Sequence, residues 1–240
     1  MNSLILEGYS VTDDVEKKFK DVWSDLLLGQ TLSTSNNPKI VLLGGQPGAG
    51  KAFGSKKVID ELNGNVLVIN GDDYRHYHSR YEDIYKVHNK EASKYTGDFA
   101  GLMVSKVRDE AIKHRFNVII EGTFRTIETP LKELNKFKEN AYCTEVIICT
   151  CPKDISWQST IERGDKDLKA GGIPRYTPKE HHDLVVACLA KNVDAIVKTR
   201  LVNRLRVFNR EKMLFDSVLD TQQMPSDVIE VELNRTYINT

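Results

Sequence analysis

Residues 39–54 read KIVLLGGQPGAGKAFG, and this stretch decides which fold the chain can form. The apolar run KIVLLGG, which lies between Pro38 and a glycine-rich segment, is typical of a buried parallel strand. Gly45, Gly50 and Lys51 then follow with the G-x-x-x-x-G-K spacing of a phosphate-binding loop, after which a helix is expected. Backbone N–H groups of such a loop surround a phosphate while its lysine neutralises the oxygens. The stretch therefore predicts a nucleoside triphosphate site, and the alternative is a plain glycine turn that carries a lysine.

Ala52 is the unusual residue of this loop. The residues expected to contact the nucleotide are Gly45, Gln46, Pro47, Gly48, Ala49, Gly50, Lys51 and Ala52. At the last position a Ser or Thr normally gives its hydroxyl to a magnesium ion. Phosphates and water supply most other ligands of that ion, so alanine should weaken metal placement without abolishing phosphate binding. We expect Ala52→Thr to lower the magnesium requirement or to raise the rate.

The length fits one large domain, or one domain with an extra helical layer, and the charge balance gives no sign of a charged macromolecular partner. The chain has 240 residues, with 34 Lys and Arg against 34 Asp and Glu, so its formal net charge is zero. A balanced charge gives no global electrostatic reason to expect nucleic acid or a membrane surface as a partner. The N-terminal residues show no basic segment followed by a long apolar stretch, and no segment approaches transmembrane length. We therefore expect a cytoplasmic protein.

The four cysteines are predicted to be buried free thiols. Cys143, Cys149 and Cys151 lie in or beside the apolar run CTEVIICTC, which predicts a buried strand with Cys149 and Cys151 on one face; Cys188 stands apart. No C-x-x-C pair is present, so a zinc site or a disulfide is less favoured than free thiols. No metal-ligating residues are predicted.

Strand and helix patterns alternate along the chain. Apolar runs predict strands at 65–70, 117–122 and 144–151, and helical periodicity marks 12–29, 99–115, 153–163 and 178–197. Thr12 is the expected N-cap of the first helix, and Thr177-Pro178-Lys179-Glu180 predicts a capping box for the last. LRVFNR and MLFDS suggest a late hairpin, and the charged stretch LKELNKFKEN is expected to be a solvated helix face. The alternation predicts a parallel α/β sheet covered by helices on both faces.

Polar residues follow two of these strands. Asp72 or Asp73 could accept a proton from a substrate hydroxyl, although Asn-Gly-Asp-Asp is equally good turn chemistry. Glu121, Thr123 and Arg125 alternate after the third strand, which would put an acid, a hydroxyl and a guanidinium on one face. Because ligands of α/β proteins bind at the carboxyl ends of strands, both segments are candidate site residues.

Two arginines and one histidine pair leave alternatives open. Arg163 and Arg175 flank GDKDLKAGGIP and could close over a transferring phosphoryl group, but arginines in a solvated loop often serve solubility alone. His181 and His182 are neighbours on a predicted helix, where surface or capping roles are favoured over metal binding.

The motifs in this order resemble those of the zeta toxin family, the toxins of epsilon/zeta toxin–antitoxin systems. Members of this family are kinases of UDP-N-acetylglucosamine and related UDP-sugars. The resemblance runs from the first helix to about residue 220 and rests on LLGGQPGAGK, INGDDYR, YTGDFAGLMVSKV, IIEGTFRT, STIER and PRYTPKEHHDLVV. It implies a P-loop kinase-like domain over residues 1–240, with an N-terminal helix and linker (1–37) packed on it and additional C-terminal elements. It also implies ATP and Mg²⁺ as cofactors, a UDP-sugar substrate and a small helical antitoxin as partner.

The resemblance carries roles over to individual residues. It implies that Lys51 holds the ATP phosphates, that Asp72 is the general base, and that Arg163 and Arg175 stabilise the transferred phosphoryl group. The implied substrate-binding positions are Asp72, Arg75, Ser105, Glu121, Thr123 and Arg125.

Three positions depart from the family pattern. Ala52 lacks the hydroxyl, Asn70 stands where relatives commonly have Asp, and an ungapped alignment places Ser105 where relatives have a substrate-contacting Glu. These departures keep two further hypotheses open beside an active toxin kinase: a pseudokinase that binds the nucleotide or UDP-sugar, and a P-loop kinase for another small hydroxyl substrate.

Overall fold

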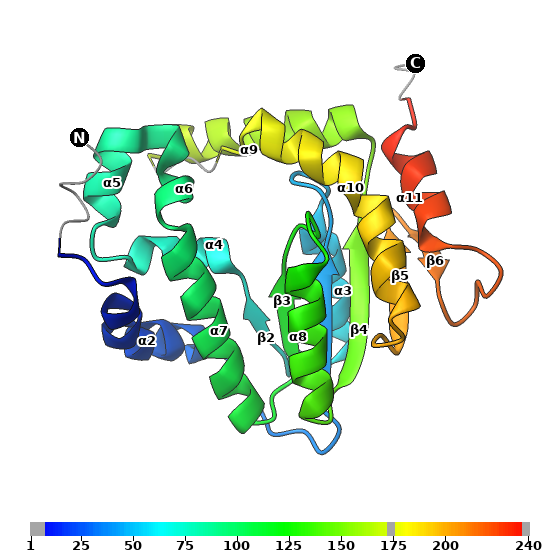
Figure 1. Cartoon of the computed structure of the whole chain (residues 1–240), viewed down its shortest axis with the longest axis horizontal. Coiled ribbons are helices and arrows are strands. Elements are labelled where there is room, and N and C mark those ends of the chain that lie inside the picture. Colours follow the sequence, from blue (N-terminus) through cyan, green and yellow to red (C-terminus); the bar gives the residue numbers. More distant parts are fainter. Residues whose placement is uncertain (1–7, 172–175, 237–240) are drawn as a thin grey trace.

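A mixed β-sheet organises the chain in the computed structural model, which describes residues 8–171 and 176–236. Within those residues the sheet has six strands in the order β2-β3-β1-β4-β5-β6 (Figure 1). Its strands are β1 (Lys39–Gly44), β2 (Leu67–Ile69), β3 (Val118–Glu121), β4 (Cys143–Cys149), β5 (Arg204–Phe208) and β6 (Met213–Asp216). All neighbouring pairs are parallel except β5 and β6, which form the expected hairpin. The predicted P-loop kinase-like α/β fold is confirmed.

The register brings three strand ends to one edge of the sheet. Ile69 at the end of β2 pairs with Ile120, and Leu43 near the end of β1 pairs with Glu121. Gly44, the last residue of β1, pairs with Ile148 of β4. The segments that begin at Gly45, Asn70 and Gly122 therefore leave the sheet at the same carboxyl edge, where ligands of such sheets bind.

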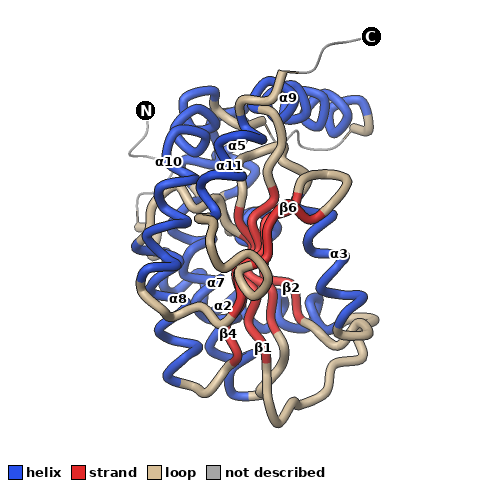
Figure 2. The backbone as a smooth tube through the Cα atoms, turned by 90° about the vertical axis from the view of Figure 1, so that its right-hand side faces the viewer, coloured by secondary structure: helices blue, strands red, loops and turns tan. Residues whose placement is uncertain are grey.

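The two faces of the sheet are covered unequally (Figure 2). On one face, α3 (Lys51–Glu61) packs Val58 against Val41, Ile119 and Ile147. The other face carries the larger apolar cluster, which contains residues of α7 (Gly97–Lys113), α8 (Glu128–Glu139), α10 (Lys179–Lys198) and α11 (Pro225–Leu233). α2 (Val11–Leu27) packs on α7, on the outside of this layer (Figure 1).

Two predicted helix starts are wrong. Ser10, rather than Thr12, caps α2, because its Oγ accepts a hydrogen bond from the Asp13 backbone N–H at 3.3 Å. α10 begins at Lys179, with Pro178 at the N-cap and no side-chain cap. The Thr177 hydroxyl, expected to cap this helix, instead accepts a hydrogen bond from an Arg163 N–H at 3.5 Å.

Several helices differ from the sequence-based expectations. α9 extends over Lys153–Lys169, so Arg163 lies on a helix rather than beside a loop. The segment after β2 folds into short helical turns: α4 (Gly71–Tyr74), η1 (Arg75–Tyr77), α5 (Tyr81–His88), η2 (Asn89–Glu91) and α6 (Ala92–Tyr95). LKELNKFKEN belongs to α8, as expected, but three of its residues, Glu133, Leu134 and Phe137, are buried. The prediction that this stretch is a solvated helix face is therefore wrong for the side of α8 that carries these three residues.

Candidate functional site

The glycine loop between β1 and α3 is shaped by close contacts with β4 and α9. Gly45 has φ = 139°, and a Cβ there would lie 2.0 Å from the Cys149 carbonyl oxygen. Gly48 has φ = 77°, and a Cβ there would lie 2.0 Å from the Ser156 carbonyl oxygen. No side chain fits at either position, so the loop backbone can turn tightly into the N-terminus of α3. A loop of this form at a helix N-terminus is an anion-binding site.

Two side chains anchor this loop, one from within the motif and one from outside it. Gln46 is fully buried, and its Nε2 donates to the Cys151 carbonyl at 2.7 Å. Arg210, just beyond β5, donates from one terminal nitrogen to the Gly48 carbonyl and to Ser159 Oγ. The G-x-x-x-x-G-K spacing gave no signal for Arg210, because its contact joins residues far apart in the sequence.

Lys51 lies among carboxylates that the chain brings from other strand ends. Dehydration lowers the pKa of Lys51, and the charges of Glu121 and Asp72 oppose that shift. Burial raises the pKa of Glu121, and Lys51 opposes it. The segments that carry Lys51 and Asp72 and the end of β3 at Glu121 all lie at the same carboxyl edge of the sheet.

Asp72 is held in place while its carboxylate stays open to solvent. The Asn70 side chain caps α4 by accepting the Asp72 backbone N–H at 3.1 Å. Arg75 Nε donates to Asp72 Oδ1 at 2.8 Å, and Arg75 Nη1 donates to the Ser93 carbonyl and to Thr96 Oγ1. The Asp72 side chain is nevertheless 62% exposed. Asn-Gly-Asp-Asp thus starts a short helix rather than forming only a turn, and Asn70 keeps the capping oxygen that Asp would supply.

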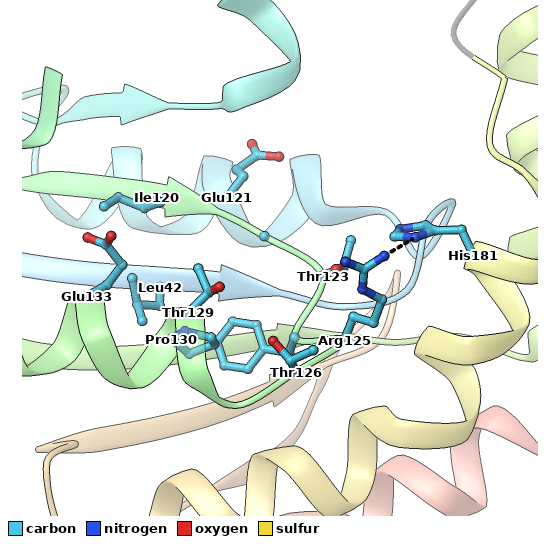
Figure 3. Close-up of a pocket in the computed structure, with 12 residues that line it drawn as sticks. Leu42, Ile120, Glu121, Thr123, Arg125, Thr126, Thr129, Pro130, Glu133 and His181 are labelled. Atoms are coloured by element: carbon cyan, nitrogen blue, oxygen red, sulfur yellow. Dashed lines mark hydrogen bonds between the residues drawn. The ribbon is translucent and has the colours of Figure 1, made fainter. Parts of the chain in front are cut away.

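A pocket of about 250 Å³ opens beside this edge (Figure 3). Its lining comprises Leu42, Ile120, Glu121, Gly122, Thr123, Phe124, Arg125, Thr126, Thr129, Pro130, Glu133 and His181. Glu121, Thr123 and Arg125 all line it, but not through strand alternation. β3 ends at Glu121, and Phe124 has a left-handed φ of 56°. The loop is fixed by Asn192 Nδ2, which donates to the carbonyls of Phe124 and Arg125 at 2.9 and 2.8 Å.

The expectation of a surface or capping role is wrong for His182, which is buried, whereas His181 is partly exposed and lines the pocket. His181 Nδ1 lies 3.3 Å from Arg125 Nη1 at the pocket (Figure 3). Burial, and then the Arg125 charge, lower the pKa of His181, which favours a neutral ring that accepts from the guanidinium. His182 is buried, and its Nε2 lies 2.9 Å from Ser156 Oγ, which links α10 to α9.

Ser105, Arg163 and Arg175, the remaining predicted site residues, are not among the residues that line the pocket or lie outside the described residues. Ser105 Oγ donates to the Gly101 carbonyl of its own helix at 3.1 Å, and Ser105 is not among the residues that line the pocket. The charge of Arg163 contributes to lowering the pKa of Lys51, and Arg163 is exposed on α9. Arg175 lies outside the described residues.

The cysteines are free thiols. β4 ends at Cys149, so Cys151 lies beyond the strand rather than on its face, which corrects the expected strand end. Burial raises the pKa of the Cys149 thiol to about 11. Across residues 8–171 and 176–236, no group of three or more His, Cys, Asp or Glu side chains is arranged to hold a metal ion. None of the helices in those ranges has the length and apolar character needed to span a bilayer.

Comparison with known proteins places this architecture in a family. The family model described as Zeta toxin matches residues 25–220. Toxin zeta of Streptococcus agalactiae is 32% identical over 238 residues, covering 94% of this chain and 80% of that protein. Toxin PezT of Streptococcus pneumoniae serotype 4 (strain ATCC BAA-334 / TIGR4) is 30% identical, covering 92% of this chain and 88% of that protein.

Solved structures agree with the sequence comparisons. A structure from the PezAT chromosomal toxin–antitoxin system of Streptococcus pneumoniae superposes with a TM-score of 0.83 at 25% identity, covering 95% of this chain and 89% of the other. The AvrRxo1-ORF1:-ORF2 structure with ATP has a TM-score of 0.63 at 11% identity, over 95% of this chain and 74% of the other, and shows a shared fold alone. The family model, the relatives and the shared fold agree, and the chain belongs to the zeta toxin family of toxin–antitoxin systems, with a kinase-like fold.

Proposed function

We propose that the protein is an ATP-dependent kinase that phosphorylates a hydroxyl of UDP-N-acetylglucosamine or a related UDP-sugar. The observation that carries this proposal is the shared sheet edge. The glycine loop before Lys51, the segment with the exposed Asp72 carboxylate and the segment with the pocket residue Arg125 all begin at the carboxyl ends of neighbouring parallel strands. A phosphate donor and a hydroxyl acceptor bound there would meet between Lys51 and Asp72.

The loop geometry fits a nucleoside triphosphate. Gly45 and Gly48 leave a concave backbone where any Cβ would collide with β4 or α9, and α3 begins at Lys51. Backbone N–H groups and Lys51 would hold the phosphates of ATP, and the partly dehydrated ammonium would interact with them more strongly than it would in water. Arg163 is the second cation proposed to neutralise the transferring group.

The chain offers few ligands of its own to magnesium. Ala52 has no hydroxyl, and the described part of the chain contains no preformed cluster of metal ligands. Mg²⁺ would therefore be held mainly by the phosphates and water, which it commonly retains in such sites. Bound in this way, it would neutralise charge on the β- and γ-phosphates.

Asp72 is the proposed general base. As the acceptor oxygen bonds to the γ-phosphorus, its proton passes to the Asp72 carboxylate, and the bond from the γ-phosphorus to the bridging oxygen breaks to release ADP. Arg75 occupies one carboxylate oxygen, and the Asn70 cap fixes the start of the helix. These contacts orient Asp72 without covering it.

Asp72→Asn tests the proposal directly. We expect phosphorylation of UDP-N-acetylglucosamine with ATP and Mg²⁺, followed by mass spectrometry, to slow by about 10²–10⁴-fold in this variant. Asp73→Asn is the matched control, because Asp73 is the other candidate base on the same short helix. Full activity of Asp72→Asn with loss in Asp73→Asn would move the role to Asp73. No product from any UDP-sugar with the wild-type protein would refute the kinase proposal.

A pseudokinase remains the second candidate because of Ala52. In that case calorimetry would detect binding of ATP or a UDP-sugar, while product would stay absent at saturating magnesium. Turnover that Ala52→Thr increases would instead assign Ala52 to metal affinity in a working enzyme.

The biological role follows from the family. We propose that the protein acts in the cytoplasm as a bacterial toxin that depletes cell-wall precursors, and that a small helical antitoxin neutralises it. A PezAT toxin–antitoxin structure and the match to Toxin PezT support such a partner. Co-expression of a small helical antitoxin should relieve growth inhibition, and growth arrest that no such partner relieves would count against this role.

A further inference from the structure

The N-terminal helix α2 carries a buried carboxylate that takes no part in the proposed chemistry. Asp14 lies in the first turn of α2 and is only 4% exposed. Its Oδ2 accepts hydrogen bonds from the Ser79 backbone N–H at 2.9 Å and from the Tyr9 hydroxyl at 2.8 Å. Its Oδ1 accepts a hydrogen bond from the Ser79 hydroxyl. Asp14 therefore ties α2 to a segment that lies 65 positions away in the sequence.

The Asp14 carboxylate is ionised at neutral pH. Burial alone would raise its pKa, but the hydrogen bonds from Ser79 and Tyr9 oppose burial, and the net shift of the pKa is downward. The adjacent His78 ring is neutral, because burial lowers its pKa and its Nδ1 accepts the Arg80 backbone N–H at 3.0 Å. Hydrogen bonds to an ionised acceptor are roughly twice as strong as neutral ones, so the tie between Asp14 and Ser79 is a strong one.

A second carboxylate of α2 contacts the same segment. The Tyr77 hydroxyl donates a hydrogen bond to Asp25 Oδ2 at the other end of the helix. Asp14 and Asp25 are about three helical turns apart and lie within about 20° of each other around the helix axis. One face of α2 thus presents two acceptors to residues 77–79.

The segment that α2 holds begins at the proposed general base. The Arg75 backbone N–H donates to the Asp72 carbonyl, and the His78 backbone N–H donates to the Arg75 carbonyl at 3.2 Å. Tyr74, within these turns, is 2% exposed and packs in the larger apolar cluster. Because the turns form one continuous run, a shift at Ser79 also moves the turn that carries Asp72, whose own side chain is 62% exposed.

We propose that Asp14 is a positioning residue, which holds Ser79 and thereby keeps Asp72 in place for the acceptor hydroxyl. This inference rests on the proposed kinase function and adds to it a residue of the N-terminal helix. Misplacement of a reacting group by about 1 Å can cost up to about 10²-fold in rate. Loss of the tie should therefore slow phosphoryl transfer, whereas ATP binding, which is assigned to the glycine loop and Lys51, should not change.

Hydrogen exchange of the protein without ligands tests whether the tie holds the segment. In Asp14→Asn we expect the amides of residues 71–80 to exchange about tenfold faster, while those of α3 keep the wild-type rate. Asp13→Asn is the matched control, because Asp13 is the neighbouring acid in the same helical turn and is exposed. It should leave both regions unchanged. Wild-type exchange of residues 71–80 in Asp14→Asn would overturn the inference.

Steady-state kinetics with ATP and UDP-N-acetylglucosamine test the consequence for the reaction. Asp14→Asn should lower kcat about tenfold and leave the KM for ATP unchanged. Ser79→Ala should lower kcat about threefold, because the backbone N–H still donates, and Ser79→Thr should keep the wild-type rate. The double variant Asp14→Asn/Ser79→Ala should lose no more than Asp14→Asn alone, since both changes remove the same contact.

Three results would count against the positioning role. A lower Tm of Asp14→Asn with unchanged kcat would show that Asp14 only stabilises the fold, and equal losses in Ser79→Thr and Ser79→Ala would show that the hydroxyl is not what matters. Additive losses in the double variant would show that the two residues act separately. Ser79→Ala supplies both measurements if Asp14→Asn does not fold. If the wild-type protein phosphorylates no UDP-sugar, the proposed function fails, while hydrogen exchange still decides whether Asp14 holds the segment with Asp72.

Discussion

Two buried glutamates, Glu145 and Glu133, face arginines in different parts of the molecule and differ in how completely they are paired. Glu145 Oε1 accepts from Arg206 Nε at 2.5 Å, and Glu145 Oε2 lies 3.4 Å from Lys39 Nζ. The other nitrogens of Arg206 donate to both oxygens of Glu61, at 2.5 and 2.9 Å. Glu133 has one bonded oxygen and one without a partner. The first network pairs both oxygens of Glu145, and the second leaves one buried oxygen of Glu133 without a partner among the described residues.

Position in the sheet explains the difference. Glu145 pairs in register with Val41 and Arg204, three residues before Ile148 at the carboxyl edge. Glu145 lies toward the amino end of β4, away from the P-loop, where its buried charge stabilises the fold through its ion pairs. Glu133 lies beside the carboxyl edge, where the sheet opens to ligands. Glu145 is thus paired on both oxygens inside the scaffold, whereas Glu133 keeps one oxygen without a partner beside the pocket.

Arg206→Ala should give the largest stability loss. It leaves Glu145 buried beside Lys39 alone and removes the partner of Glu61, and breaking a buried ion pair from one side typically costs about 3–5 kcal/mol. Urea unfolding followed by circular dichroism measures it. The double variant Arg206→Met/Glu145→Leu should recover much of the loss, because no uncompensated charge stays buried. A single-variant loss below about 1 kcal/mol would contradict the description of this network as structural.

Arg108→Ala should cost less, about 1–3 kcal/mol in the same assay, although Glu133 is as deeply buried as many scaffold residues. Burial already raises the pKa of Glu133, with Arg108 opposing it, so the carboxyl group can take up a proton once the arginine is gone. An Arg108→Ala loss equal to that of Arg206→Ala would show that the two networks do not differ as proposed.

Sequence reasoning predicted the edge of the sheet well because its signals are local. The glycine spacing at Gly45–Lys51, the apolar strands and the polar residues that follow them all lie within short segments, and parallel strands align their carboxyl ends automatically. Glu121, Thr123 and Arg125, predicted to share one face, line one pocket, and Phe124 between them has a left-handed φ of 56°.

The buried ion pairs were beyond sequence reasoning because their partners are distant in the chain. Arg206 contacts Glu61 across 145 positions and Glu145 across 61, and nothing local marks either pair. The burial of Glu133 was not predicted for another reason. Glu133 belongs to a charged stretch whose pattern predicted a solvated helix face, and packing in the fold buries that side of α8. A helical projection of α8 gives a signal in retrospect, because Glu133 follows Pro130 by three positions and precedes Phe137 by four, so it lies on the same side as these buried residues.

The two networks should also respond oppositely to acid, which gives the smallest but most diagnostic effect. Arg206 lowers the pKa of Glu61, so the stability from this pair exists above the ordinary glutamate pKa and is lost as pH falls through the folded value. Burial raises the pKa of Glu133, so the folded state is penalised as pH rises through that value and is relieved on acidification. Between about pH 7 and about pH 4, Glu61→Gln should therefore reduce the acid-induced fall in Tm, whereas Glu133→Gln should enlarge it. Thermal melts measure the change of Tm with pH for both variants and for the control Glu139→Gln, an exposed glutamate on α8. If both variants change this pH dependence in the same direction, the two networks do not differ as described.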